Sequence, residues 1–144
     1  MNTKTALSDQ TTLLPRPLVN QLLTQAQHSP EIEVCGLISS RNGQPAKVYP
    51  VENIAPEPGR LFRMEPEGLI DAMRQIREQG EQLFAIYHSH PHSPAIPSTT
   101  DLQQAEYPDA LYLIISLDTK GVLEMRGYRL RNDALEEVVL EISP

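Results

Sequence analysis

Residues 88 to 101 read His-Ser-His-Pro-His-Ser-Pro-Ala-Ile-Pro-Ser-Thr-Thr-Asp, and they decide most of what this chain can be. His88 and His90 stand two residues apart, and Ser98 and Asp101 follow after a proline-rich gap. Two imidazoles and a carboxylate are three suitable zinc ligands, and they leave a fourth coordination position free for water. That arrangement is typical of a catalytic zinc site rather than a structural one.

The spacing of these residues suits two adjoining elements. In an extended strand, residues two apart point to the same side, so His88 and His90 can direct both rings at one ion while Ser89 points away. Ser98 is a suitable N-cap for a short helix, and Asp101 then lies at N3, as in a capping box. The helix N-terminus helps to keep Asp101 ionised. A polar strand end and a simple helix cap are the ordinary explanations, but the joint pattern is rare by chance and favours a metal site.

A zinc hydrolase also needs a base that takes a proton from water and returns it to the leaving group. Glu33 is the candidate, because it begins an apolar strand with Cys35 and Leu37, where a charge is costly unless it is paired or functional. An exposed strand start is the alternative, which nearby Glu31 supports. Ser98 can accept a helix N–H as the cap and also donate to a developing oxyanion.

Composition limits the remaining possibilities. The chain has 144 residues, 40% of them hydrophobic, which suits one globular domain over residues 13–144 after a flexible tail over residues 1–12. A net charge of −7 argues against nucleic acid as the main partner. The single cysteine, Cys35, excludes an internal disulfide and indicates a reducing compartment. No apolar run is long enough for a membrane span and no signal peptide is recognisable, so we expect a cytoplasmic protein.

Hydrophobic periodicity predicts a mixed α/β domain with a mainly antiparallel sheet flanked by helices. The expected helices cover residues 16–28, 66–80 and 99–106. The expected strands cover residues 33–40, 47–54, 61–64, 83–88, 111–117, 122–130 and 135–142. Asn42-Gly43 marks a hairpin turn, residues 118–121 form another turn, and the last two strands complete an antiparallel meander.

Three segments of the chain resemble the JAMM (MPN+) metallopeptidase family. They are Glu-Val-Cys-Gly-Leu at 33–37, Tyr-His-Ser-His-Pro at 87–91 and Pro-Ser-Thr-Thr-Asp at 97–101. The family pattern is a glutamate in a Glu-x-Cys-Gly-like strand, followed downstream by His-x-His-x7-Ser-x2-Asp, and every element is present with matching spacing. The resemblance extends over residues 16–130, so the chain is close to the bare domain.

This resemblance implies a cytidine-deaminase-like α/β fold with one zinc ion held by His88, His90 and Asp101. Glu33 would hold and deprotonate the catalytic water, and Ser98 would stabilise the tetrahedral intermediate. Family members cleave peptide or isopeptide bonds, typically after the C-terminal glycine of ubiquitin or a ubiquitin-like protein, and some compact prokaryotic members trim sulfur-carrier proteins or release cysteine from them. We therefore expect a sulfur-carrier protein ending in Gly-Gly as the substrate, and neither nucleic acid nor a membrane as a partner.

Several alternatives stay open at this point. A non-catalytic MPN-type scaffold in a larger complex is the alternative function, although such relatives typically lack the metal ligands that this chain keeps. A zinc deaminase would need a Cys-x-x-Cys pair, which Cys35 alone cannot supply. We interpret Cys35 as a small buried residue.

A partner-dependent enzyme is a third alternative, and it would require the loop 91–97 to be ordered on binding. We interpret His92 as a solvated loop residue. The oligomeric state and the leaving group stay unassigned.

Two further expectations concern the substrate. The segment between residue 80 and His88 is too short for the long insertions with which eukaryotic deubiquitinases grip linked ubiquitin chains, so linkage selectivity is not expected. The strand that contains Phe84 and Tyr87 could supply an edge to which an extended substrate tail adds by β-augmentation, presenting Gly-Gly to the zinc ion.

Overall fold

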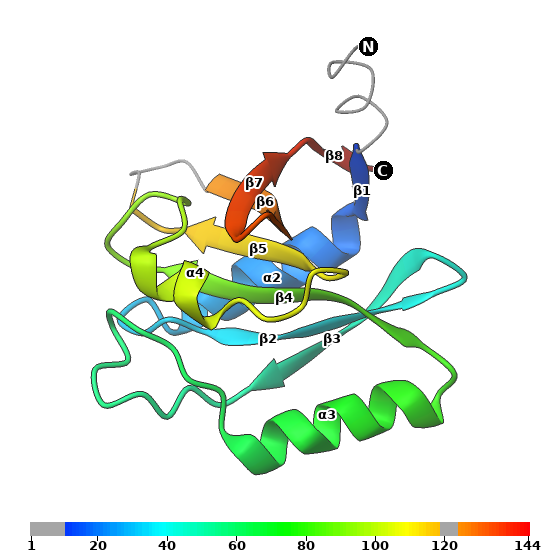
Figure 1. Cartoon of the computed structure of the whole chain (residues 1–144), viewed down its shortest axis with the longest axis horizontal. Coiled ribbons are helices and arrows are strands. Elements are labelled where there is room, and N and C mark those ends of the chain that lie inside the picture. The colour runs from blue at the N-terminus through cyan, green and yellow to red at the C-terminus, as the bar shows by residue number, and fades with distance from the viewer. Residues whose placement is uncertain (1–10, 119–123) are drawn as a thin grey trace.

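The computed structural model describes residues 11–118 and 124–144, and within them a six-stranded sheet forms the centre of the fold (Figure 1). The strand order is β3-β2-β4-β5-β6-β7, and every neighbouring pair is antiparallel except β4 and β5. The strands are β2 (Cys35–Arg41), β3 (Gln44–Val51), β4 (Gln82–His90), β5 (Leu111–Ser116), β6 (Glu124–Arg131) and β7 (Ala134–Val138). The expected mainly antiparallel α/β architecture is confirmed.

Three helices accompany the described sheet. They are α2 (Arg16–His28), α3 (Pro66–Glu78) and α4 (Thr99–Gln104). Both longer helices have proline in the first turn, where its missing N–H costs nothing. α2 and α3 pack on opposite faces of the sheet (Figure 1), and each helix buries one side of the strands in its own apolar core.

The alternation of side chains along β4 decides which residues face which helix. Ala85 and Tyr87 are buried in the core on the α2 side, whereas Ile86 belongs to the core on the α3 side. Because the side-chain period of a strand is two, His88 and His90 share the face of Ile86. The two histidines therefore end a central strand on the α3 side, where α4 and the preceding loop also lie.

β4 has no free edge over Ala85–His88, which contradicts the expectation that an extended substrate tail adds to it beside the histidines. β2 pairs with one side of β4 from Cys35↔His88 onwards, and β5 pairs with the other side through His90↔Ser116. Both rows of backbone hydrogen-bonding groups are thus used within the sheet over Ala85–His88. In this sheet only β3 and β7, as the outer strands of the described part, have an unpaired edge.

Two other strand assignments were wrong. Residues 61–64 form no strand, and only an isolated bridge joins Asn53 to Met64. The predicted strand 135–142 is divided, because the chain leaves the main sheet after β7 and forms β8 (Leu140–Ser143). β8 pairs in parallel with β1 (Thr12–Pro15), so Thr12 lies in a strand rather than in the expected tail.

A few predictions fall partly or wholly outside the described residues. These are the tail over residues 1–10, most of the turn at 118–121 and the first two positions of the strand expected at 122–130. Among the described residues, no helix is both long and apolar enough to cross a membrane.

Candidate metal centre and active site

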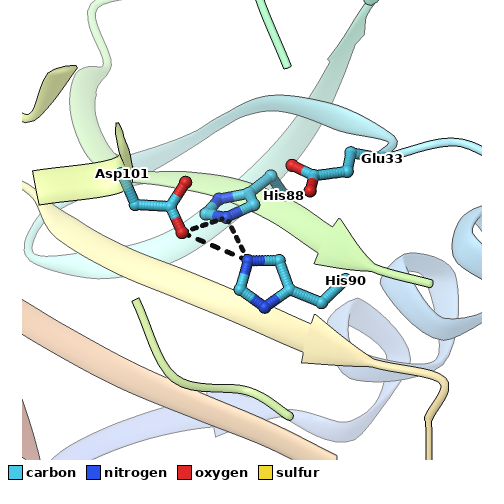
Figure 2. A group of neighbouring side chains, drawn as sticks. All are labelled: Glu33, His88, His90 and Asp101. Atoms are coloured by element: carbon cyan, nitrogen blue, oxygen red, sulfur yellow. Dashed lines mark hydrogen bonds and ion pairs between the residues drawn. The ribbon is translucent and has the colours of Figure 1, made fainter. Parts of the chain in front are cut away.

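Four side chains from three separate segments meet at the end of β4. Glu33, His88, His90 and Asp101 each offer one ligand atom, and these atoms lie within 4.8 Å of one another. Figure 2 shows Asp101 and Glu33 approaching from opposite sides of the two histidines. Glu33 lies two residues before the start of β2, since that strand begins at Cys35 rather than at Glu33 as expected. The four predicted ligand and base residues are therefore brought together.

Three of these atoms form a nearly equilateral triangle. His88 Nε2 lies 3.1 Å from His90 Nε2 and 3.2 Å from Asp101 Oδ2, and His90 Nε2 lies 3.1 Å from the same oxygen. Ligand atoms about 2.0–2.1 Å from a tetrahedral zinc ion are roughly 3.3 Å apart, so this triangle matches one face of such a tetrahedron. The two nitrogens and the oxygen are therefore spaced as ligands of a single cation.

Neighbouring groups orient both imidazole rings. His90 Nδ1 lies 2.7 Å from the carbonyl oxygen of Pro94, which fixes the proton on Nδ1 and leaves Nε2 free to bind a metal. The ring of Phe62 stacks on His88 with a centroid distance of 4.4 Å and an interplanar angle of 23°. Both histidines are almost completely buried, so their rings have little freedom to turn away from the site.

Asp101 is held by the predicted capping box of α4, and this prediction is confirmed. The Ser98 hydroxyl accepts a hydrogen bond from the Asp101 backbone N–H at 3.0 Å, and Asp101 Oδ2 accepts one from the Ser98 N–H at 2.9 Å. The two bonds of the capping box thus fix both the main chain of Asp101 and its Oδ2, which is the ligand atom. Ser98 itself is exposed and is not among the four clustered residues, but accepting the cap bond leaves its own O–H free to donate.

Glu33 lies in a different environment from that of Asp101. Glu33 is only 5% exposed, and its Oε1 is buried without a hydrogen-bond partner in the described part of the chain. Burial raises the pKa of Glu33 from its ordinary value of 4.5 to about 7, with His90 opposing the rise and Asp101 adding to it. The exposed-strand-start alternative is thus wrong for Glu33, whereas the neighbouring Glu31 side chain is 82% exposed.

The remaining pKa shifts suit a metal site. Burial acts to raise the pKa of Asp101, but hydrogen bonds from His88, His90 and the Ser98 backbone outweigh it and hold the pKa well below its usual range. Burial lowers the pKa of His88 and so favours its neutral form. Burial acts to lower the pKa of His90, but Asp101 and the Pro94 carbonyl outweigh it and raise the pKa, so a metal ion bound there competes with a proton.

An apolar pocket of about 310 Å³ adjoins the cluster on the side of His88 and Asp101. Its walls come from β2, β4, β5, β7, α3, α4 and the loops that precede α3 and β5. Its apolar lining includes Leu37, Phe62, Met64, Met73, Ile86 and Tyr112. The pocket can hold part of an extended chain next to the ligand triangle.

The loop 91–97 is attached to the sheet by contacts of its own. Ser116 Oγ donates to the Ser93 carbonyl at 2.7 Å, and the Tyr128 hydroxyl donates to the Ala95 carbonyl at 2.7 Å. The Ala95 N–H donates to Glu124 Oε1 at 3.2 Å, and Ala95 is fully buried. These contacts attach the loop to β5 and β6. His92 is exposed there and lies 3.9 Å from Glu31, as expected of a solvated residue.

Sequence reasoning missed Phe62 as a neighbour of the site. The mainly apolar stretch from Leu61 to Met64, which contains Phe62, predicts a short strand and gives no sign of a contact with the histidines. Cys35 was interpreted correctly: it is fully buried, its Sγ donates to the Val51 carbonyl at 3.3 Å, and burial raises its pKa to about 12. Such a thiol is not a nucleophile.

Comparison with known proteins identifies the family. The family model for prokaryotic homologs of the JAB domain, Prok-JAB, matches residues 15–130. Among curated relatives, the desampylase of Haloferax volcanii is 35% identical over 119 residues, which are 81% of this chain and 83% of that protein. The CysO-cysteine peptidase of Mycobacterium tuberculosis is 30% identical over 122 residues, which are 83% of each chain.

Solved structures have the same fold. Protein DSY2949 from Desulfitobacterium hafniense is 29% identical and superposes with a TM-score of 0.79 over 92% of both chains. The JAB1/MPN domain protein AF2198 from Archaeoglobus fulgidus is 18% identical and has a TM-score of 0.59 over 93% of this chain and 97% of its own. The cytidine-deaminase-like α/β description therefore holds. The chain belongs to the Prok-JAB family of prokaryotic JAB-domain homologs, in agreement with its resemblance to the JAMM (MPN+) group.

Proposed function

We propose that this protein is a zinc metallopeptidase that hydrolyses the peptide or isopeptide bond after the C-terminal Gly-Gly of a ubiquitin-like sulfur-carrier protein. The observation that carries the proposal is the triangle of His88, His90 and Asp101 ligand atoms, with Glu33 beside it, whose Oε1 is buried without a hydrogen-bond partner in the described residues. The names of the relatives, a desampylase and a CysO-cysteine peptidase, support the hydrolase class and the substrate class.

His88, His90 and Asp101 are proposed to hold one zinc ion. Two imidazoles and one carboxylate form a three-ligand set of the catalytic type, and the spacing of their atoms fits tetrahedral zinc. When bound, zinc would polarise the scissile carbonyl and lower the pKa of a water molecule toward neutrality.

Glu33 is proposed to be the general base and then the general acid. A carboxylate with a pKa of about 7 can take a proton from water near neutral pH and then give it up to the departing amine. Ser98 is proposed to donate its hydroxyl hydrogen to the developing oxyanion, since its oxygen already accepts the cap bond from Asp101.

The carrier tail is proposed to lie in the apolar pocket beside His88 and Asp101. The pocket borders the ligand triangle, and β4 is paired on both sides over Ala85–His88, which leaves no edge for the tail there. Because His88 and Asp101 line the pocket, a carbonyl presented from it would meet the triangle. Figure 2 shows Glu33 on the other side of His88 from Asp101. A non-catalytic scaffold is the alternative function, and it would have no use for a buried carboxylate without a partner. The cytoplasmic location stays a prediction from composition.

The test is cleavage of defined conjugates, followed by intact mass. The probes are a ubiquitin-like sulfur-carrier protein extended after Gly-Gly by cysteine, and the same carrier joined through Gly-Gly to a lysine ε-amine. The zinc-loaded protein should release the mature carrier from at least one probe. Glu33→Gln should abolish turnover and still bind zinc, whereas the matched control Glu31→Gln should behave as the unaltered protein. Turnover retained in Glu33→Gln would exclude Glu33 as the base, and zinc-loaded protein inert on both probes would overturn the substrate class.

A further inference from the structure

The main chain around Glu33 is held by two side chains that belong to neither the ligand set nor the pocket. Ser89 lies between the two histidines but on the opposite face of β4, where it is fully buried. Asn53 lies at the neck of the loop that connects β3 to α3. Both side chains bond to the segment 32–34, and neither has a role in the mechanism described above.

Where β2 leaves the sheet, the Ser89 hydroxyl takes the place of a backbone carbonyl as hydrogen-bond acceptor. The β2–β4 ladder ends at Cys35↔His88, and one residue further the Ser89 N–H still donates to the Val34 carbonyl at 2.9 Å. The return bond is made by a side chain, because the Val34 N–H donates to Ser89 Oγ at 2.9 Å. The same hydroxyl donates to the Ile32 carbonyl at 3.4 Å. Ser89 therefore bonds to the residues on both sides of Glu33.

Asn53 holds Glu33 itself. Its Nδ2 donates to the Glu33 carbonyl at 2.9 Å, and the same amide contacts the carbonyls of Pro58 at 3.3 Å and Leu61 at 2.9 Å. The Glu33 N–H donates to the Pro58 carbonyl at 2.7 Å, so both backbone groups of Glu33 bond to the Asn53 loop or to Asn53. That loop also carries Phe62, which stacks on His88.

The oxygen side of Asn53 completes the loop. Its Oδ1 accepts from the N–H groups of Ala55 at 2.9 Å and Arg63 at 3.0 Å. The amide thus uses donors and acceptors together to join the two ends of the loop to Glu33. An aspartate at this position would keep both acceptor bonds and lose every donor bond.

These backbone contacts matter because no such bond holds one of the two carboxylate oxygens. Glu33 Oε1 has no hydrogen-bond partner in the described residues. A base must be within hydrogen-bond reach of the proton it removes, and a displacement of about 1 Å can cost about 100-fold in rate. The position of the carboxylate therefore depends on where its main chain is fixed.

We propose that Ser89 and Asn53 are positioning residues that fix the main chain on either side of Glu33, and so set the distance from its carboxylate to the metal centre. The inference rests on the proposed role of Glu33 as the base. The Ser89 contacts couple the base to the metal ligands directly, because Ser89 lies between His88 and His90 on β4. The Asn53 contacts couple the base to the pocket through the loop that Asn53 organises.

The first test compares catalytic constants and metal content. Ser89→Ala and Asn53→Asp should each lower kcat by about 10- to 100-fold on whichever carrier conjugate the unaltered protein cleaves, with KM within about twofold and zinc stoichiometry unchanged. Ser89→Thr, which keeps the hydroxyl, should recover most of the loss. Ser39→Ala is the matched control, since it removes another fully buried serine hydroxyl from the distant end of β2. Asn20→Asp, on the exposed side of α2, is the control for the amide.

The second test needs no turnover. Amide hydrogen exchange followed by NMR on the folded protein should show faster exchange at Val34 in Ser89→Ala and at Glu33 in Asn53→Asp, with the core strands unchanged. Unaltered kcat in both variants, or a fall in kcat that follows zinc loss or matches Ser39→Ala, would overturn the inference. If the unaltered protein cleaves neither conjugate, the proposed function fails, and exchange rates at Val34 and Glu33 then decide the positional role alone.

Discussion

Glu33 makes the metal-free protein less stable as the pH rises, and this cost can be measured. The change is Glu33→Gln, which keeps the shape of the side chain and removes its charge. Glu33 is only 5% exposed, and its Oε1 has no hydrogen-bond partner in the described residues, so the folded state disfavours the ionised form. Glutamine does not titrate, so it avoids that penalty at every pH.

The magnitude follows from the two pKa values. Burial raises the pKa of Glu33 from 4.5 to about 7, so between these pH values the folded state binds more protons than the unfolded state. Stability therefore falls as the pH rises through this window, and it levels off above about pH 7. At about 1.4 kcal/mol per pH unit, the loss totals about 3 kcal/mol. Glu33→Gln should thus gain about 3 kcal/mol over the unaltered protein between pH 4.5 and pH 8.

Denaturant unfolding of chelator-treated protein measures this difference. The free energy of unfolding is determined for both proteins at several pH values from 4.5 to 8, and the difference is plotted against pH. Other titrating groups contribute to both proteins and largely cancel. Zinc should reduce the gain, because a nearby cation favours the ionised carboxylate. If the difference in unfolding free energy stays constant from pH 4.5 to 8 in the metal-free protein, the reasoning that burial disfavours the ionised form of Glu33 is refuted.

Three further substitutions test separate parts of the structure. Asp101→Ala should lose most of its affinity for zinc, as measured by metal content after dialysis, and full zinc occupancy would indicate another ligand set. Ser98→Ala should lower stability by about 1 kcal/mol in thermal unfolding, through loss of the cap, and kcat by about 100-fold or more if the hydroxyl stabilises the oxyanion; equal kcat would remove that role. Gly36→Ala should lower stability by about 1–3 kcal/mol or more, because a Cβ would lie 2.5 Å from the Tyr49 carbonyl oxygen and 2.6 Å from the Tyr87 hydroxyl; an unchanged melting temperature would contradict this packing.

The fold was predictable where local pattern decides the structure. Both longer helices follow from apolar spacing after a proline, and α2 has the expected bounds. The division of residues 135–142 was not predictable, because β8 leaves the meander to pair with β1 at the other end of the chain. Alternating apolar residues indicate a strand without naming its partner. For the same reason, the sequence could not show that both edges of β4 are occupied.

The candidate site shows the same division between local and distant causes. The side chains of His88, His90, Ser98 and Asp101 are placed by a strand end and a six-residue helix with its cap, so their spacing alone predicts their approach. Glu33 was a candidate base because it begins an apolar strand, and the family resemblance favoured it further, but its burial and its raised pKa come from packing.

The supporting side chains were missed because their partners are far away in sequence. Ser89 bonds to Val34 across 55 positions, and Asn53 bonds to Glu33 across 20. A serine between two histidines and an asparagine after a strand have no spacing rule that would reveal such contacts. In the proposed mechanism, these contacts set where the carboxylate stands relative to the ligand triangle. The ligand motif would then supply the reacting groups, whereas side chains outside the motif would set the distance at which they meet, and an error of about 1 Å in that distance can cost about 100-fold in rate.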